Sequence, residues 1–92
     1  MIYSGKKAVT TAGTAVVLGT ELINGPLIVR ANAANTGLIY IGNDGDGDVA
    51  AANGFELNAK DEVIFEHIGL MSEIWLDCAV SGEGVSWLRL NI

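Results

Sequence analysis

Residues 74–92, IWLDCAVSGEGVSWLRLNI, decide the expected fold. Two runs rich in β-branched, aromatic and apolar residues flank the triplet 82–84, which is typical of a tight loop between two strands. With this triplet as the loop, one face is nearly apolar and the other places Asp77 opposite Arg89, with Gly84 in a left-handed conformation. The stretch therefore predicts a β-hairpin with one buried face and one face that meets water or a partner.

The rest of the chain carries the same signals of strands and turns. Its 92 residues include 12 glycines, which separate short β-branched or aromatic runs, and helical periodicity is weak throughout. We expect one domain over residues 1–92, with residues 1–7 as an N-terminal arm. The predicted fold is all-β, a small β-sandwich or jelly-roll-like barrel of about seven to eight short antiparallel strands. The strands are expected at residues 8–10, 15–21, 27–33, 38–42, 54–57, 62–67, 74–80 and 85–91.

Alternation within the predicted strands assigns side chains to faces. In one strand Leu27 and Val29 point one way while Ile28 and Arg30 point the other, so that strand is half-buried. Residues 38–41, LIYI, are apolar on both faces. They form either a central strand that is covered twice or a strand whose outer face meets another subunit.

Composition and charge limit the classes of partner. Half of the residues are hydrophobic and only 17% are charged, so we expect apolar surface to remain for a homo-oligomer, with a trimer as first choice. The net charge of −6 argues against nucleic acid, whose binding rests on phosphate neutralisation. The N-terminus has no apolar run typical of a signal peptide, and no window suits a membrane-spanning helix. We expect a chain made in a cytoplasm, with no membrane partner.

The strongest candidate for a metal site is the aspartate-rich loop at residues 43–48. Its alternating carboxylates resemble those of a calcium loop, which uses oxygen ligands. However, Val49 stands where an EF-hand loop needs glycine, and Phe55 stands where it needs the bidentate glutamate. We therefore predict no metal ligands, no cofactor, and no calcium affinity tighter than about millimolar.

No set of residues predicts catalysis. His67 is the only histidine, and Cys78 falls on the apolar face of the expected hairpin, where a thiol behaves as a small hydrophobe. A small hydrolase with paired carboxylates is the catalytic alternative, since glycosidases use two of them. Its candidates are scattered over the expected strands, which is typical of solvated faces: Glu56, Glu62, Glu66 and Glu73. We expect a protein that is not an enzyme and has no catalytic residues.

Large aromatic and arginine side chains are the candidates for a binding interface, because such residues are enriched at interface hot spots. The two tryptophans are either core residues or contacts between subunits. The expected interface residues are Trp75, Trp87, Arg30, Arg89 and Tyr40.

Four segments carry a resemblance to a known group of proteins. They are GTAVVLGTE at 13–21, NTGLIYIGND at 35–44, NGFELNAKDEVIFE at 53–66 and IWLDCAVSGEGVSWLRL at 74–90. Together they resemble small all-β virion accessory proteins of tailed bacteriophages. The chain departs from the pattern at residues 59–61, where similar chains tend to have a proline-glycine turn, and at Cys78, where the residue is usually smaller.

This resemblance implies a structural virion protein made in the host cytoplasm. The expected function is that of a capsid cement or decoration subunit, which stabilises the head lattice as a trimer or other oligomer on the major capsid protein or another virion protein. A tail or head-fibre component is an alternative within the same class. A carbohydrate-binding adhesin module, in which Trp75 and Trp87 stack on sugars, is the alternative from another class.

Overall fold

The computed structural model describes residues 1–42, 47–66 and 69–90, and these ranges form an all-β protein. This confirms the fold class expected from the sequence. The only helix in the described ranges is the short 3-10 turn η1 (Met71–Glu73), so none of the described helical residues could cross a membrane. The strands are β1 (Ile2–Ala8), β2 (Val16–Val17), β3 (Leu22–Ile23), β4 (Leu27–Ala31), β5 (Ile39–Ile41), β6 (Phe55–Leu57), β7 (Glu62–Phe65), β8 (Gly69–Leu70), β9 (Trp75–Cys78) and β10 (Gly84–Leu90).

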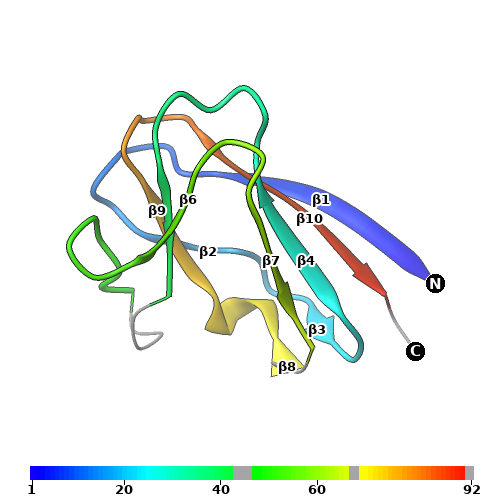
Figure 1. The fold of residues 1–92 in the computed structure, drawn as a ribbon. Helices are drawn as coiled ribbons and strands as arrows, with labels where there is room; N and C mark the ends of the chain where they lie inside the picture. The colour runs from blue at the N-terminus through cyan, green and yellow to red at the C-terminus, as the bar shows by residue number, and fades with distance from the viewer. Residues whose placement is uncertain (43–46, 67–68, 91–92) are drawn as a thin grey trace.

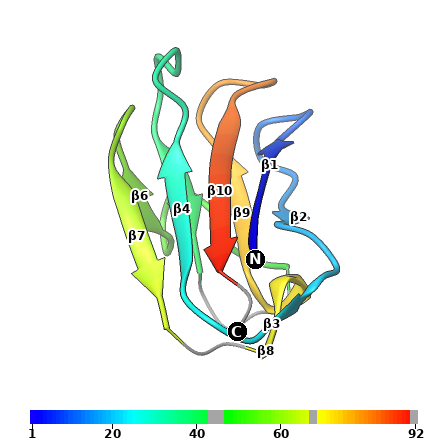
Figure 2. The same ribbon diagram turned by 90° about the vertical axis from the view of Figure 1, so that its right-hand side faces the viewer.

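The strands form two four-stranded sheets and one small pair. The first sheet has the order β1-β10-β4-β7, the second sheet has the order β2-β9-β5-β6, and β3 pairs with β8. Every pairing is antiparallel. Figure 1 shows this arrangement, and Figure 2 shows the strands of the first sheet side by side in front of β6, β9 and β2.

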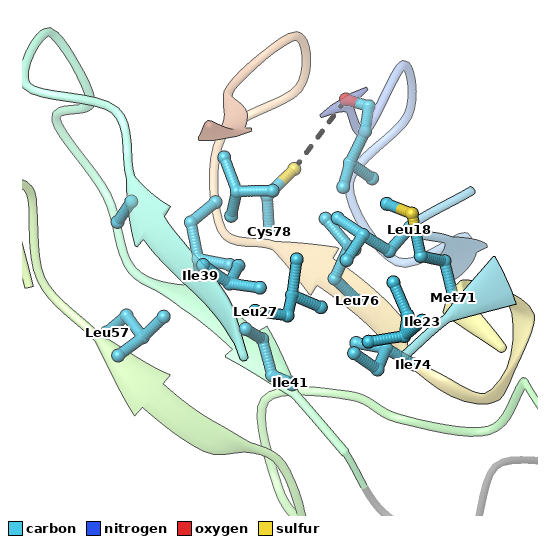
Figure 3. Packing of buried hydrophobic residues seen from close by; sticks show 14 residues of the cluster. Leu18, Ile23, Leu27, Ile39, Ile41, Leu57, Met71, Ile74, Leu76 and Cys78 are labelled. Atoms are coloured by element: carbon cyan, nitrogen blue, oxygen red, sulfur yellow. Dashed lines mark hydrogen bonds between the residues drawn. The ribbon is translucent and has the colours of Figure 1, made fainter. Parts of the chain in front are cut away.

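One apolar core joins the inner faces of the two larger sheets (Figure 3). The first sheet contributes Leu27, Val29, Ala31 and Val85, and the second contributes Ile39, Ile41, Leu57, Leu76 and Cys78. Ile28 and Arg30 of β4 are less buried than their neighbours, in the alternation predicted from the sequence. The inner and outer faces of β4 are therefore those expected.

Strand β5 is covered on both faces. Ile39 and Ile41 belong to the core, and Tyr40, which points the other way, is only 7% exposed. β5 also lies between β9 and β6 in its sheet. Of the two interpretations of residues 38–41, the central strand that is covered twice is the one the fold adopts.

The predicted hairpin at residues 74–92 is wrong. Its two halves lie in different sheets, because β9 pairs with β2 and β5 whereas β10 pairs with β1 and β4. Asp77 lies opposite Tyr40, and Arg89 lies opposite Tyr3 and Leu27. The segment between the strands crosses from one sheet to the other instead of folding β10 back along β9.

Backbone hydrogen bonds to Val9 explain the crossing. The Gly82 amide donates to the Val9 carbonyl at 2.8 Å, and the Val9 amide donates to the Glu83 carbonyl at 2.9 Å. The left-handed residue is Gly82, with φ of +89°, and not Gly84 as predicted. A positive φ suits glycine, which has no Cβ to clash. Glycines occupy the turn between β9 and β10, as predicted, but this turn connects strands of two different sheets and not the two strands of a hairpin.

The N-terminus is a strand and not the arm that residues 1–7 were expected to form. β1 pairs with β10 along its whole length, from Ile2 opposite Leu90 to Ala8 opposite Gly84. The short strands β3 and β8 were not predicted either, and they bring the described strands to ten. Two-residue strands carry too few side chains for alternation to be seen.

Candidate functional site

The outer face of the first sheet is the strongest candidate for a functional surface. The register aligns Lys6, Ser86, Arg30 and Glu62 in one row across the four strands. The next row contains Ser4, Leu88, Ile28 and Ile64. Ile2 and Leu90 lie opposite each other beyond that row. We call these ten residues the open face, and its two complete rows the polar row and the apolar row.

Apolar side chains of the open face are exposed. Ile2 is 66% exposed and Ile64 is 57% exposed, and Leu88 and Leu90 are also exposed. An outward face of an antiparallel sheet is usually polar. Contiguous exposed apolar side chains with a polar border are typical of an interaction surface.

A shallow hollow marks the centre of the open face. Its volume is about 240 Å³, and its lining combines a cation, a carboxylate and apolar side chains from β4, β7 and β10: Ile28, Arg30, Glu62, Ser86, Trp87 and Leu88. Arg30 and Glu62 lie opposite each other on adjacent strands, and opposite charges in this relation attract. The hollow can therefore accept a side chain with an apolar part and a polar end.

The outer face of the second sheet is covered by the chain itself. Asp77 is buried, and its Oδ1 accepts a hydrogen bond of 2.9 Å from the Gly13 amide, which holds the segment before β2 against β9. Gly54 approaches Tyr40 so closely that a Cβ atom at Gly54 would lie 2.6 Å from the Tyr40 Cβ. At Gly47 the corresponding Cβ would lie 3.0 Å from the Trp75 ring. The two sheets thus differ in the described part of the chain, because loops lie on the outer face of the second sheet and none of the described loops lies on that of the first.

The five predicted interface residues do not form one site. Tyr40 and Trp75 belong to the second sheet and lie under the loops just described. Trp87 is half-buried against the core, and a Cβ at Gly5 of β1 would lie 2.5 Å from its ring. Trp87 also borders the hollow, and Arg30 is exposed beside it. Only these two of the five predicted residues meet at the hollow, and of the two only Arg30 belongs to the open face.

Arg89, the fifth predicted interface residue, contacts two other strands, β1 and β3. Its guanidinium lies 4.5 Å from the centre of the Tyr3 ring on β1, a distance typical of a cation–π contact. Its Nη1 donates to the Leu22 carbonyl on β3 at 2.5 Å. Arg89 therefore joins the first sheet to the small β3-β8 sheet, which gives it a structural role in the fold.

Cys78 behaves as the small hydrophobe expected from the sequence. It is buried in the core, and its Sγ donates to the Val80 carbonyl at 3.1 Å and more weakly to the Val9 carbonyl at 3.8 Å (Figure 3). Burial, followed by the negative charges of Asp77 and Glu83, raises the pKa of the thiol. A buried thiol with a raised pKa is a poor nucleophile at neutral pH.

Glu83 has a role that sequence reasoning missed. Its carboxylate accepts hydrogen bonds from the Thr36 amide at 2.7 Å, the Thr36 hydroxyl at 2.9 Å and the Gly37 amide at 3.0 Å. The bonds from Gly37 and then Thr36 lower the pKa of the carboxyl group. Glu83 thus fastens the crossing segment to the turn before β5.

A second, wholly apolar pocket lies where β5 and β6 meet β7. Its volume is about 190 Å³, and it is lined by Ile41, Gly42, Phe55, Val63 and Phe65. Pockets for drug-sized ligands usually start at about 300 Å³ and contain a few polar groups that orient the ligand. This pocket is smaller and has an apolar lining, so it is a gap at the edge of the core.

The other candidate residues do not assemble in the described ranges. Glu56 lies on β6, Glu62 on β7 and Glu73 in η1, where Glu73 accepts from the Leu70 amide. Among the described residues no group of three or more histidine, cysteine or acidic side chains could hold a metal ion. The aspartate-loop residues 43–46 and His67 lie outside the described residues.

Sequence reasoning missed the apolar part of the open face. Alternation placed Ile28 outward beside Arg30, and the same rule puts Ile64 on the outward face with Glu62. However, the row that joins them to Leu88 depends on the order β10-β4-β7, which alternation does not reveal. The outward apolar residues could therefore be predicted within each strand, but the surface that they form together could not.

Comparison of the chain with models of protein families, with curated proteins and with solved structures found no match in any of the three.

Proposed function

We propose that this protein is a structural subunit that acts by binding through its open face. The observation that supports this most strongly is the difference between the two sheets. Loops cover the outer face of the second sheet, while the outer face of the first sheet leaves Ile2, Leu88 and Ile64 in water. Exposed apolar surface costs solubility and is therefore usually found where a partner covers it. A binding subunit needs this surface and needs no catalytic residues.

The assembly we propose is the virion of a tailed bacteriophage, in which the chain is a capsid cement or decoration subunit. The support for this step is the resemblance of segments 13–21, 35–44, 53–66 and 74–90 to small virion accessory proteins. A subunit present in many symmetric copies gains avidity from modest contacts at each copy. The carbohydrate-binding alternative has less support, because Trp75 is covered by Gly47 and Trp87 packs against the core.

Particle composition tests this proposal. In particles purified from cells infected with the phage that encodes the chain, quantitative mass spectrometry should find it in a fixed ratio to the major capsid protein. Separation of heads from tails should place it with the heads, and heads that lack it should rupture at a lower temperature. Its absence from all particles would contradict the virion proposal, and its presence only in tails or fibres would contradict the cement function.

A pair of matched variants tests the role of the open face in the same particles. Leu88→Asp places a carboxylate in the apolar row, whereas Leu22→Asp makes the same change at an exposed leucine of β3. Leu88→Asp should reduce the number of copies per head by about tenfold or more, and Leu22→Asp should leave it unchanged. Equal incorporation of the two folded variants would show that the open face is not used.

A further inference from the structure

The open face is complementary to itself, and we propose that its occupant is a second copy of this chain. In the proposed pair the two first sheets pack face to face around a twofold axis that lies between β10 and β4. The axis is inclined by roughly 15° to the strands, because aligned sheets cross at about 30°. The inference deepens the proposed function, on which it rests, by naming the partner of the same surface. The evidence for this pairing is the order of the side chains in the polar and apolar rows.

The twofold axis brings unlike groups of the polar row together. It places β7 of one copy over β1 of the other, so that Glu62 of each copy faces Lys6 of its mate. Arg30 of each copy then faces Ser86 of the other. Lys6 and Glu62 lie at opposite edges of the sheet, on β1 and β7, so the two ion pairs form at opposite rims of the interface.

The same operation buries the apolar row. Leu88 of one copy faces Ile28 of the other, close to the axis, and Ile64 covers Ser4. Aligned sheets that pack face to face stand about 10 Å apart and cross at about 30°. This crossing displaces the rims more than the centre, and the flexible stem of Lys6 can follow the displacement. The result is an apolar centre with a charged rim, as in known protein interfaces.

A twofold axis perpendicular to the strands fits less well. It exchanges the ends of the strands, so that Lys6 and Arg30 of one copy lie over the end of the other copy that carries Ile2 and Leu90. Cations would then be buried against apolar side chains, which costs free energy. The distribution of charge therefore selects one of the two face-to-face arrangements.

The net charge of the chain also favours this surface for self-association. The chain carries −6, which opposes the approach of two copies over most of their surface. The polar row contains two cations, Lys6 and Arg30, and one anion, Glu62, and therefore sums to +1. Repulsion between copies is thus weaker at the open face than elsewhere.

The pair replaces the trimer that we expected from the sequence. A threefold ring needs two different surfaces that fit each other, whereas a twofold pair needs one surface that fits itself. Lys6 at one rim and Glu62 at the other meet the second condition. The open face therefore favours two copies.

Sedimentation of the isolated protein tests the pair directly. The full chain should form a concentration-dependent dimer, and Ile28→Asp should raise the dissociation constant by about tenfold or more because it buries a carboxylate at the axis. Leu22→Asp, which places the same charge on β3, should leave the dissociation constant unchanged. A wild-type chain that stays monomeric at about 100 μM, or one that forms trimers, would overturn the proposal.

A charge exchange tests the contact between Lys6 and Glu62 of different copies. Lys6→Glu gives a chain with glutamate at both rims, and Glu62→Lys gives a chain with lysine at both, so each should dimerise poorly alone. A mixture of the two should form a heterodimer, because both rim contacts then join opposite charges. High salt should reduce this recovery. If both single variants dimerise as tightly as wild type, or if mixing restores nothing, the pairing is wrong.

The outcome can be separated from that of the particle experiment, because self-association is measured without any capsid. A dimer that never enters particles contradicts the proposed function alone. A chain that enters particles but is monomeric at about 100 μM, with Leu88→Asp still impaired in particles, contradicts the pair alone and assigns the open face to another virion protein.

Discussion

Gly84 occupies a position in which no side chain fits. A Cβ atom there would lie 2.0 Å from the Lys7 carbonyl oxygen and 2.7 Å from the Ala8 Cα, both on the neighbouring strand β1. These are backbone atoms, which cannot move away as a flexible side chain can. The close approach of β1 and β10 at this end of the sheet therefore requires glycine.

Gly84→Ala should consequently destabilise the fold. We expect a loss of about 3 kcal/mol in the free energy of unfolding, the upper end of the usual cost of overpacking. Ser4→Ala is the control, since Ser4 is exposed on β1, and it should change the free energy by no more than about 0.5 kcal/mol. Urea unfolding of both variants measures the difference. Similar stability of the two variants would contradict the contact at Gly84.

Glu83 makes the stability depend on pH. Its hydrogen bonds to Gly37 and Thr36 hold its folded-state pKa below the ordinary value of 4.5. The unfolded state therefore takes up this proton first as pH falls, so the stabilisation is complete above pH 4.5 and is lost as pH falls through the folded pKa. Glu83→Gln should be less stable than wild type at about pH 7, and the gap should narrow in acid.

Urea titrations at neutral and acid pH check this prediction. Val80→Ala is the control, because Val80 is exposed in the same segment and does not titrate. Its difference from wild type should stay constant across the pH range. A constant difference for Glu83→Gln as well would show that the carboxylate does not stabilise the crossing segment.

At the scale of the strands, the alternation of apolar and polar residues predicted which face of a strand is buried, but it did not predict which strands pair with each other. It separated Leu27 from Ile28, and it recognised residues 38–41 as apolar on both sides. It could not show that β9 and β10 lie in different sheets, because a strand alternates in the same way whichever neighbour it pairs with. The contacts that decide the pairing are non-local, such as the backbone bonds of Gly82 and Glu83 to Val9.

The central position of β5 predicts a large cost for any cavity within it. Ile39 is fully buried between the two sheets, whereas Leu22 on β3 is more than half exposed. Ile39→Ala should lower the free energy of unfolding by about 2–5 kcal/mol, and Leu22→Ala by less than about 1 kcal/mol. Denaturation of the two variants provides the comparison. Equal losses would show that β5 is not central to the core.

At the scale of the whole molecule, the candidate surface results from the way the strands are assembled. Arg30 was predicted as a contact from its own strand, but Ile64 and Leu88 become its neighbours only when β7 and β10 flank β4. Trp75 and Tyr40 were predicted for the same reason and lie instead beneath loops that no pattern placed there. A single sequence shows which side chains are suited to binding, and the topology decides which of them reach the surface.

The pairing of β1 with β10 also sets the order in which the fold can form. These strands lie at opposite ends of the described sequence, with Ile2 opposite Leu90, so their pairing closes the longest loop among the described strand pairs. During synthesis β1 emerges before β10 and stays unpaired until β10, its partner in the first sheet, has been made. Docking of so distant a strand should follow the rate-limiting step of folding.

Tyr3→Ala should therefore accelerate unfolding and leave the refolding rate nearly unchanged, as expected of a contact formed after the transition state. Stopped-flow measurements in both directions would show it, and slower refolding would place β1 in the nucleus instead. If β1 docks last, the state that precedes the native fold leaves the β10 edge uncovered. The exposed backbone of β10 could then pair with the β1 strand of another newly made chain. The rate at which β1 docks therefore governs how many chains associate in this way when the protein is produced at high concentration.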